Sequence, residues 1–265
     1  MTRTLTPLKT TSRLEAALRS NGELGLIPYA MGGYPDLHRS QQIAIDLARS
    51  GAVAIEIGIP FNDPLADGPV IQAAGQAALE SGATMAGCLE LAGVVAKESP
   101  VPVVLMTYGN PILAYGRERF ADQLAQLGVA GVIVADLPAD EAELMRPLFR
   151  DAGVDQVFLV APTSSDDRIR RVCEVSSGFV YCVTLAGVTG ARKALPRDLS
   201  AFLQRVRRHT DLPLVAGFGV SKPEHLRSLR GVADAAIVAS ALVAEVQAGR
   251  DPSVLAQHLA EACRR

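Results

Sequence analysis

The chain has 265 residues, of which 49% are apolar and 20% charged, and its formal net charge is −2 at pH 7. This length allows one large α/β domain or two small ones, and the even charge balance does not suggest a nucleic-acid-binding surface. The four cysteines lack Cys-x-x-Cys spacing, so we expect reduced, buried thiols in a cytoplasmic protein and neither a metal site nor a disulfide framework. We expect no signal peptide, because the N-terminus lacks an apolar core followed by a cleavage site, and no membrane-spanning segment, because no apolar run reaches about 18 residues.

Short, β-branched apolar runs alternate along the chain with longer amphipathic segments. The predicted strands are residues 24–30, 53–59, 101–106, 131–135, 156–160, 178–183, 214–216 and 234–239. The predicted helices between them are residues 37–50, 85–98, 117–127, 141–152, 165–176, 200–209, 223–229 and 242–249, with extra helices at 12–20 and 252–262. Near-continuous apolar strands that alternate with helices are typical of a parallel sheet.

The number of these strand–helix units indicates the fold. Eight units in about 250 residues match the size of a (β/α)8 barrel. We therefore predict a single α/β domain over residues 1–265, a (β/α)8 TIM barrel with an extra N-terminal helix. An open, doubly wound sheet is the alternative, but it would need a domain break or a crevice where the strand order reverses, and the chain shows no composition shift or linker.

Two carboxylates follow each other closely around the second predicted strand. Glu56 lies within the apolar run 53–59, where burial should raise the pKa of a carboxyl group, as a general acid or base near neutral pH requires. Asp67 follows in a proline-stiffened loop, so the two groups can divide proton transfer between them. The alternatives are a buried glutamate satisfied by backbone donors and a turn-stabilising aspartate before Gly68.

Three glycines and a serine follow the last three predicted strands. Gly190 follows the sixth, Gly217 and Gly219 follow the seventh, and Ser240 follows the eighth. Barrels commonly hold phosphate through backbone N–H groups in these loops, where glycine permits close approach. Each glycine alone reads as a turn, but together they predict a phosphate site. Segment 187–193, with small residues and two cations, is typical of a mobile lid.

Residues 55–69 resemble the signature of the tryptophan synthase alpha subunit family, whose pattern runs roughly E-[LIV]-G-x-P-[FY]-S-D-P-x-A-D-G-P. Later motifs resemble the same family in order and spacing, at residues 108–111, 134–138, 160–163, 178–181, 187–190, 217–221 and 239–241. The likeness covers residues 12–245. It implies a (β/α)8 barrel that cleaves indole-3-glycerol phosphate into indole and glyceraldehyde 3-phosphate, a retro-aldol reaction without metal or organic cofactor.

The resemblance also implies roles for individual residues. Glu56 and Asp67 would be catalytic: Glu56 protonates indole C3 and accepts the 3′-hydroxyl proton, while ionised Asp67 binds the indole N–H. Substrate-binding roles are implied for Tyr29, Ile71, Tyr108, Tyr181 and Thr189. Phosphate-binding roles are implied for Gly190, Gly217, Gly219, Ala239 and Ser240. Thr189 would couple the lid to Asp67.

Three residues depart from the family pattern: Met31 stands for threonine, Asn62 for serine and Ala239 for glycine. Asn62 keeps hydrogen-bonding capacity, and Ala239 can still offer its N–H unless that position needs a positive φ angle. The catalytic pair is intact.

The resemblance implies a partner, a pyridoxal-phosphate-dependent beta subunit in an α2β2 heterotetramer, which receives indole through a tunnel. Loops 62–64, 108–111 and 136–138 would contact it. The alternative is a stand-alone lyase that releases free indole for another pathway. A catalytically weak barrel kept as an allosteric partner is a third interpretation, against which the intact Glu56 and Asp67 argue. A different phosphate-binding barrel enzyme is a fourth, against which the lack of a strand-end lysine argues.

Overall fold

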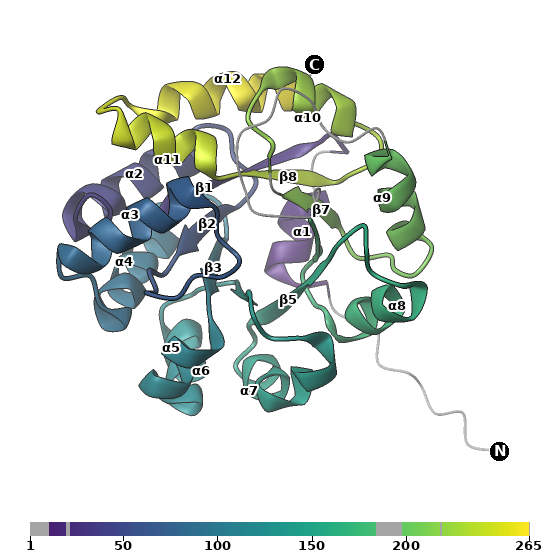
Figure 1. Ribbon diagram of the computed structural model, residues 1–265, viewed down its shortest axis with the longest axis horizontal. Coiled ribbons are helices and arrows are strands. Elements are labelled where there is room, and N and C mark those ends of the chain that lie inside the picture. The colour runs from purple at the N-terminus through teal and green to yellow at the C-terminus, as the bar shows by residue number, and fades with distance from the viewer. Residues whose placement is uncertain (1–10, 20–21, 184–197, 218, 265) are drawn as a thin grey trace.

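The computed structural model describes residues 11–19, 22–183, 198–217 and 219–264, and it contains a closed parallel β-barrel (Figure 1). The strands run around the barrel in sequence order and β8 pairs with β1, which excludes the open sheet. They are β1 (Gly25–Met31), β2 (Ile55–Gly58), β3 (Val103–Thr107), β4 (Gly131–Val134), β5 (Asp155–Val160), β6 (Val180–Val183), β7 (Leu214–Gly217) and β8 (Ala235–Val238). The predicted (β/α)8 barrel is confirmed.

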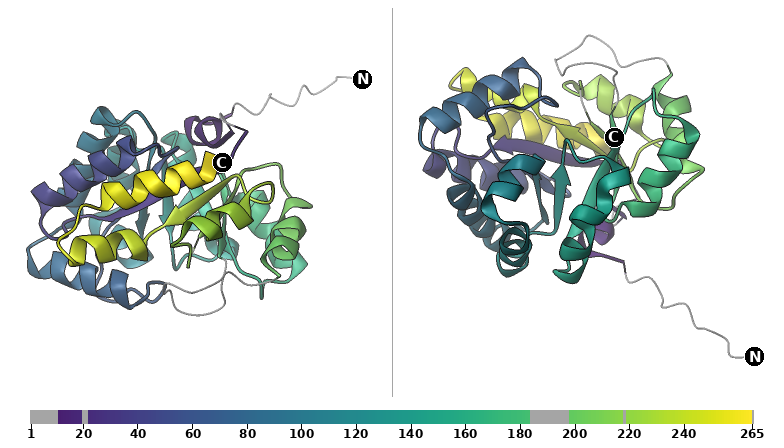
Figure 2. Two further views of the ribbon diagram at one scale, coloured as in Figure 1. Left: turned by 90° about the horizontal axis from the view of Figure 1, so that it is seen from above. Right: turned by 60° about the horizontal axis from the view of Figure 1, so that its bottom comes forward.

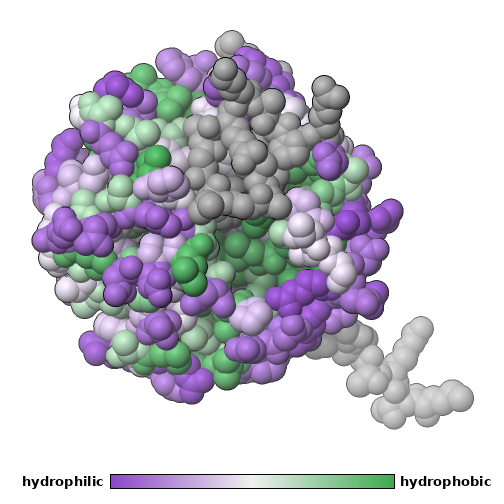
Figure 3. Space-filling view, in the orientation of Figure 1, coloured by the Kyte–Doolittle hydropathy of each residue, from purple (hydrophilic) through white to green (hydrophobic). Residues whose placement is uncertain are grey.

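Helices form the outer layer around the barrel (Figure 1). They are α2 (Leu37–Arg49), α3 (Pro69–Glu80), α4 (Met85–Glu98), α5 (Gly109–Tyr115), α6 (Arg117–Gln126), η1 (Ala139–Leu144), α7 (Arg146–Asp151), α8 (Asp166–Val175), α9 (Leu199–Arg207), α10 (Pro223–Leu229), α11 (Ser240–Gln247) and α12 (Pro252–Arg264). Within the described ranges no single helix is long and apolar enough to cross a membrane. Helices α3 and α4 meet the criteria of length and apolarity only when they are taken together, and a bend of 109° separates them. The space-filling view shows apolar residues at the centre of the visible face and polar residues around it (Figure 3).

The sequence prediction missed two helices and merged two others. Helix α3 begins with Pro69 directly after the signature loop, and α5 is only seven residues long. The predicted helix 141–152 is interrupted at Met145, where η1 ends and α7 begins. Pro147 explains the break, because proline has no N–H to continue the helical hydrogen bonds and is tolerated in a first turn.

The extra N-terminal helix α1 (Arg13–Arg19) lies at one end of the barrel, outside the ring of helices (Figure 2). The side chain of Leu14 is fully buried there, in the space left by Gly131 and Gly178, where an added Cβ would come within 2.9 Å of it. This close approach explains why both positions lack side chains.

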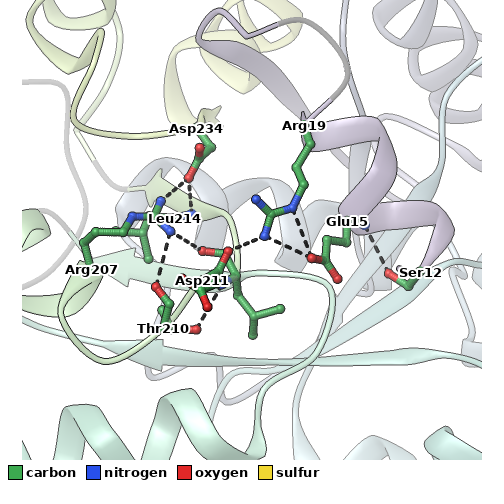
Figure 4. Close-up of polar contacts among 9 residues, drawn as sticks. Ser12, Glu15, Arg19, Arg207, Thr210, Asp211, Leu214 and Asp234 are labelled. Atoms are coloured by element: carbon green, nitrogen blue, oxygen red, sulfur yellow. Dashed lines mark hydrogen bonds and ion pairs between the residues drawn. The ribbon is translucent and has the colours of Figure 1, made fainter. Parts of the chain in front are cut away.

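Polar contacts tie the loops together beside α1 (Figure 4). Arg19 pairs with Glu15 at 3.0 Å, and Arg207 pairs with Asp234, whose carboxylate also accepts the Leu214 N–H at 2.7 Å. A cavity of about 740 Å³ opens among Arg19, Arg207, Asp234 and their neighbours. This cavity lies at the N-terminal ends of the strands. In (β/α)8 barrels that end contributes to stability, and the active site lies at the opposite end.

Candidate active site

Glu56 is the second residue of β2, opposite Tyr29 of β1 and Val104 of β3. Only 3% of its surface is exposed, and its Oε2 atom has no hydrogen-bond partner among the described residues. Burial, and to a lesser degree the charge of Asp67, raise the pKa of Glu56 to about 8. The group is therefore protonated at neutral pH and can act as an acid.

Asp67 lies in the loop between β2 and α3, and 7% of it is exposed. The loop is fixed by its backbone: the Asp67 N–H donates to the Pro64 carbonyl at 3.0 Å, and the Gln72 side chain donates to the Asp67 carbonyl at 2.9 Å. Its Oδ2 atom accepts a hydrogen bond from the Tyr108 hydroxyl at 3.0 Å. The pKa of Asp67 is raised to about 6. Burial is the larger effect and raises the pKa, and the hydrogen bond from Tyr108 partly opposes it. Asp67 is therefore ionised where Glu56 is still protonated.

Both carboxylates line one cavity of about 30 Å³ at the C-terminal end of the barrel. Its other lining residues are Tyr29, Ile71, Met106, Tyr181, Gly219, Val220, Ile237, Ala239 and Ser240. The space suffices for about one water molecule. The sequence prediction did not include Met106, Val220 or Ile237. The signal for Met106 and Ile237 was the alternation of their strands, which turns every second residue towards the barrel interior, whereas Val220 lies beyond the end of β7 and gave no such signal.

Two glycines at strand ends make room for two of the tyrosines. An added Cβ on Gly58 would lie 1.9 Å from the Tyr29 hydroxyl, and one on Gly217 would lie 2.2 Å from the Tyr181 hydroxyl. Tyr29 itself donates to the Met31 sulfur at 3.8 Å. The absence of a side chain at Gly217 therefore serves the packing of Tyr181, independently of any phosphate contact.

The structure describes some of the expected phosphate-binding residues and leaves others outside its described ranges. Gly219 has φ +79°, a left-handed conformation that favours glycine, and Ser240 is the first residue of α11. Ala239 has φ −113°, so this position does not need the positive φ angle that would favour glycine. The N-terminal N–H groups of a helix favour an anion at this point. Thr189 and Gly190, with the expected lid 187–193, lie outside the described residues.

Comparisons with known proteins identify relatives along almost the whole chain. A family model described as "Tryptophan synthase alpha chain" matches residues 15–265. The tryptophan synthase alpha chain of Acidiphilium cryptum (strain JF-5) is 48% identical over 237 residues, which cover 89% of this chain and 86% of the relative. That of Bacillus cereus (strain AH820) is 45% identical over 231 residues, covering 87% and 89%.

Solved structures agree with these relatives. A structure of Mycobacterium tuberculosis tryptophan synthase matches with a TM-score of 0.90 at 36% identity, covering 96% of this chain and 99% of that chain. The tryptophan synthase subunit alpha of Legionella pneumophila str. Paris matches with a TM-score of 0.86 at 31% identity, covering 96% and 99%. The barrel described above is therefore the fold of these proteins.

Proposed function

The chain belongs to the tryptophan synthase alpha chain family, and we propose that Glu56 and Asp67 carry out its reaction. Members of this family are lyases, and the reaction is the cleavage of indole-3-glycerol phosphate in tryptophan biosynthesis. The observation that carries the proposal is the placement of two buried carboxylates in one cavity with pKa values of about 8 and about 6. Between these values one group is an acid and the other a base, as proton transfer to and from one substrate requires.

The reaction needs two proton transfers and no net change in the enzyme. Protonated Glu56 gives its proton to indole C3, which makes the ring an electron sink. The resulting carboxylate then takes the proton of the 3′-hydroxyl group, the C3–C3′ bond breaks, and its electron pair returns to the ring. Indole and glyceraldehyde 3-phosphate are formed, and Glu56 is protonated again. Ionised Asp67 accepts the indole N–H and stabilises the positive charge that develops on the ring.

The phosphate group would lie against Gly219, Ala239 and Ser240, at the N-terminus of α11. These three residues line the same cavity as Glu56, and the helix N-terminus favours an anion there. Gly190, Gly217 and Thr189 are proposed to take part on the resemblance to the family alone.

Turnover of two matched variants tests the catalytic assignment. Glu56→Gln removes a transferable proton and Asp67→Asn removes a negative charge, while both keep the side-chain volume, so we expect both to lose most cleavage of indole-3-glycerol phosphate. Glu90→Gln is the control, because Glu90 is exposed on α4, away from the cavity and from the proposed partner surface. Near-normal rates of Glu56→Gln would refute the mechanism.

Relatives solved as tryptophan synthase imply a beta subunit for this chain as well. We propose an α2β2 heterotetramer with a pyridoxal-phosphate-dependent beta subunit, contacted by loops 62–64, 108–111 and 136–138. Exposed apolar side chains next to two of these loops support this surface: Leu65, which follows loop 62–64, is 79% exposed, and Leu113, on α5 just after residue 111, is 57% exposed. Size-exclusion chromatography with a purified beta subunit tests it, and separate elution at micromolar concentration would contradict it. The comparisons give no support to a stand-alone lyase.

We also propose a cytoplasmic location. All four cysteines are unpaired and buried, as the sequence predicted, and unpaired thiols are typical of a reducing compartment. Fractionation of cells that make the protein tests this, and recovery outside the cytoplasmic fraction would contradict it.

A further inference from the structure

The side chain of Tyr108 contacts the Asp67 loop at three points. Its hydroxyl donates to Asp67 Oδ2 at 3.0 Å and accepts the Ala66 N–H at 3.3 Å. Its ring packs against that of Phe61, with centroids 5.3 Å apart and planes inclined by 35°. Only 2% of Tyr108 is exposed, so these contacts fix both the ring and the hydroxyl.

The backbone after Tyr108 is fixed by the next loop. The Gly109 N–H donates to Asp136 Oδ1 at 2.7 Å, across the loops that follow β3 and β4. Helix α5 begins at Gly109 and its cap residue, Tyr108, makes no side-chain cap hydrogen bond. Asp136 therefore supplies the acceptor that the first turn of α5 would otherwise lack.

These contacts form one chain, Asp67–Tyr108–Gly109–Asp136, across the three loops after β2, β3 and β4. A phenol has one O–H to donate, and Tyr108 gives it to Asp67. Its hydroxyl also accepts a backbone N–H, and Tyr108 is not among the described residues that line the cavity of Glu56. Little of its polar capacity remains for the substrate.

We propose that Tyr108 is a positioning residue that acts on the reaction through Asp67, and that Asp136 holds Tyr108 in place. This replaces the substrate-binding role that the resemblance implied for Tyr108, and it rests on the proposed function of Asp67. Loops 108–111 and 136–138 are also the proposed partner surface. A partner that moves Asp136 would therefore reach the catalytic carboxylate through two hydrogen bonds.

The hydrogen bond from Tyr108 has a definite effect on ionisation. It favours the charged form of Asp67, so its loss raises the pKa of that group from about 6. If Asp67 must be ionised for cleavage, the acid limb of the rate–pH profile moves to higher pH. A purely structural or substrate-binding tyrosine would not move this limb.

Steady-state cleavage of indole-3-glycerol phosphate by Tyr108→Phe tests the proposal. We expect kcat to fall about tenfold, as for one lost hydrogen bond to a charged group, with KM changed by less than about twofold. The acid limb should move up by about one pH unit. Tyr115→Phe is the control, since its hydroxyl bonds Gln123 on α6 and not Asp67.

A double variant separates an action through Asp67 from a direct contact with the substrate. In the Asp67→Asn background, Tyr108→Phe should cost no further rate. Asp136→Ala should lower kcat in the same direction, and Asp136→Asn, whose amide oxygen can still accept, should recover most of the rate.

A rise in KM at constant kcat, an unmoved acid limb, or a full additional loss in the double variant would overturn the positioning role. Full activity of Asp67→Asn alone would overturn the proposed function itself.

Discussion

The free energy of unfolding of Glu56→Gln, measured relative to that of the wild type, should increase as the pH rises. The pKa of Glu56 is about 8 in the folded chain, against 4.5 for an ordinary glutamate. Between these values the unfolded chain has lost the proton and the folded chain still holds it, so wild-type stability falls as pH rises through the window. The difference of 3.5 pKa units at 1.36 kcal/mol each amounts to about 5 kcal/mol.

Glutamine does not titrate, so the stability of the Glu56→Gln variant does not fall in this way as the pH rises. The buried amide needs its own hydrogen bonds, a penalty of about 1–3 kcal/mol that does not change with pH. The pH dependence of the difference between the two proteins is therefore the informative quantity, and its absolute value at one pH is not.

Urea unfolding of wild type and Glu56→Gln at pH 5, 7 and 9 measures it. The difference in the free energy of unfolding should shift in favour of the variant by several kcal/mol between pH 5 and pH 9. Glu90→Gln, at an exposed position of α4, is the control and should show no such shift. Parallel stability curves for wild type and Glu56→Gln would refute the raised pKa on which the mechanism depends.

Three further predictions follow from the same site. Asp67→Asn should lower kcat about 10²–10³-fold in steady-state assays, as for a lost charge-stabilising group, and a loss confined to KM would contradict its role. The kcat/KM of the wild type should be bell-shaped, rising with a pKa near 6 for Asp67 and falling with one near 8 for Glu56; a profile that is flat from pH 5 to pH 9 would contradict this pair. Gly58→Ala should destabilise the fold by about 1–3 kcal/mol in urea unfolding, because its Cβ would lie 1.9 Å from the Tyr29 hydroxyl. Adding Tyr29→Phe to Gly58→Ala should recover part of that loss. Equal stability of Gly58→Ala and the double variant would show that the Tyr29 hydroxyl is not the obstacle.

The barrel was predictable because its strands are buried on both faces. Runs such as residues 101–106 and 131–135 are apolar throughout, and the helices between the strands show a clear period, so the order of elements followed from the pattern alone. The pattern failed where local chemistry was ambiguous. Helix α3 is rich in alanine and carries no charged residue before Glu80, α5 is short, and Pro147 interrupts a segment whose periodicity reads as one helix.

The site was predictable in part. Glu56 stood out as a charge within an apolar strand, and the structure shows the expected burial and direction of its pKa. The partner of Asp67 could not be read from the sequence, because Tyr108 is 41 residues away and meets it only when adjacent strands align their C-terminal ends. The packing of Tyr181 over Gly217 was hidden for the same reason, since a glycine after a strand reads equally as a turn or a phosphate contact.

The central claim is that this chain cleaves indole-3-glycerol phosphate with Glu56 as its proton donor and acceptor. Steady-state cleavage by the purified chain, with and without a purified beta subunit and with Glu56→Gln in parallel, tests it most directly. We expect slow turnover that the beta subunit stimulates strongly and that Glu56→Gln lacks under both conditions. Equal turnover by wild type and Glu56→Gln, or none by the wild type with the partner present, would contradict the claim.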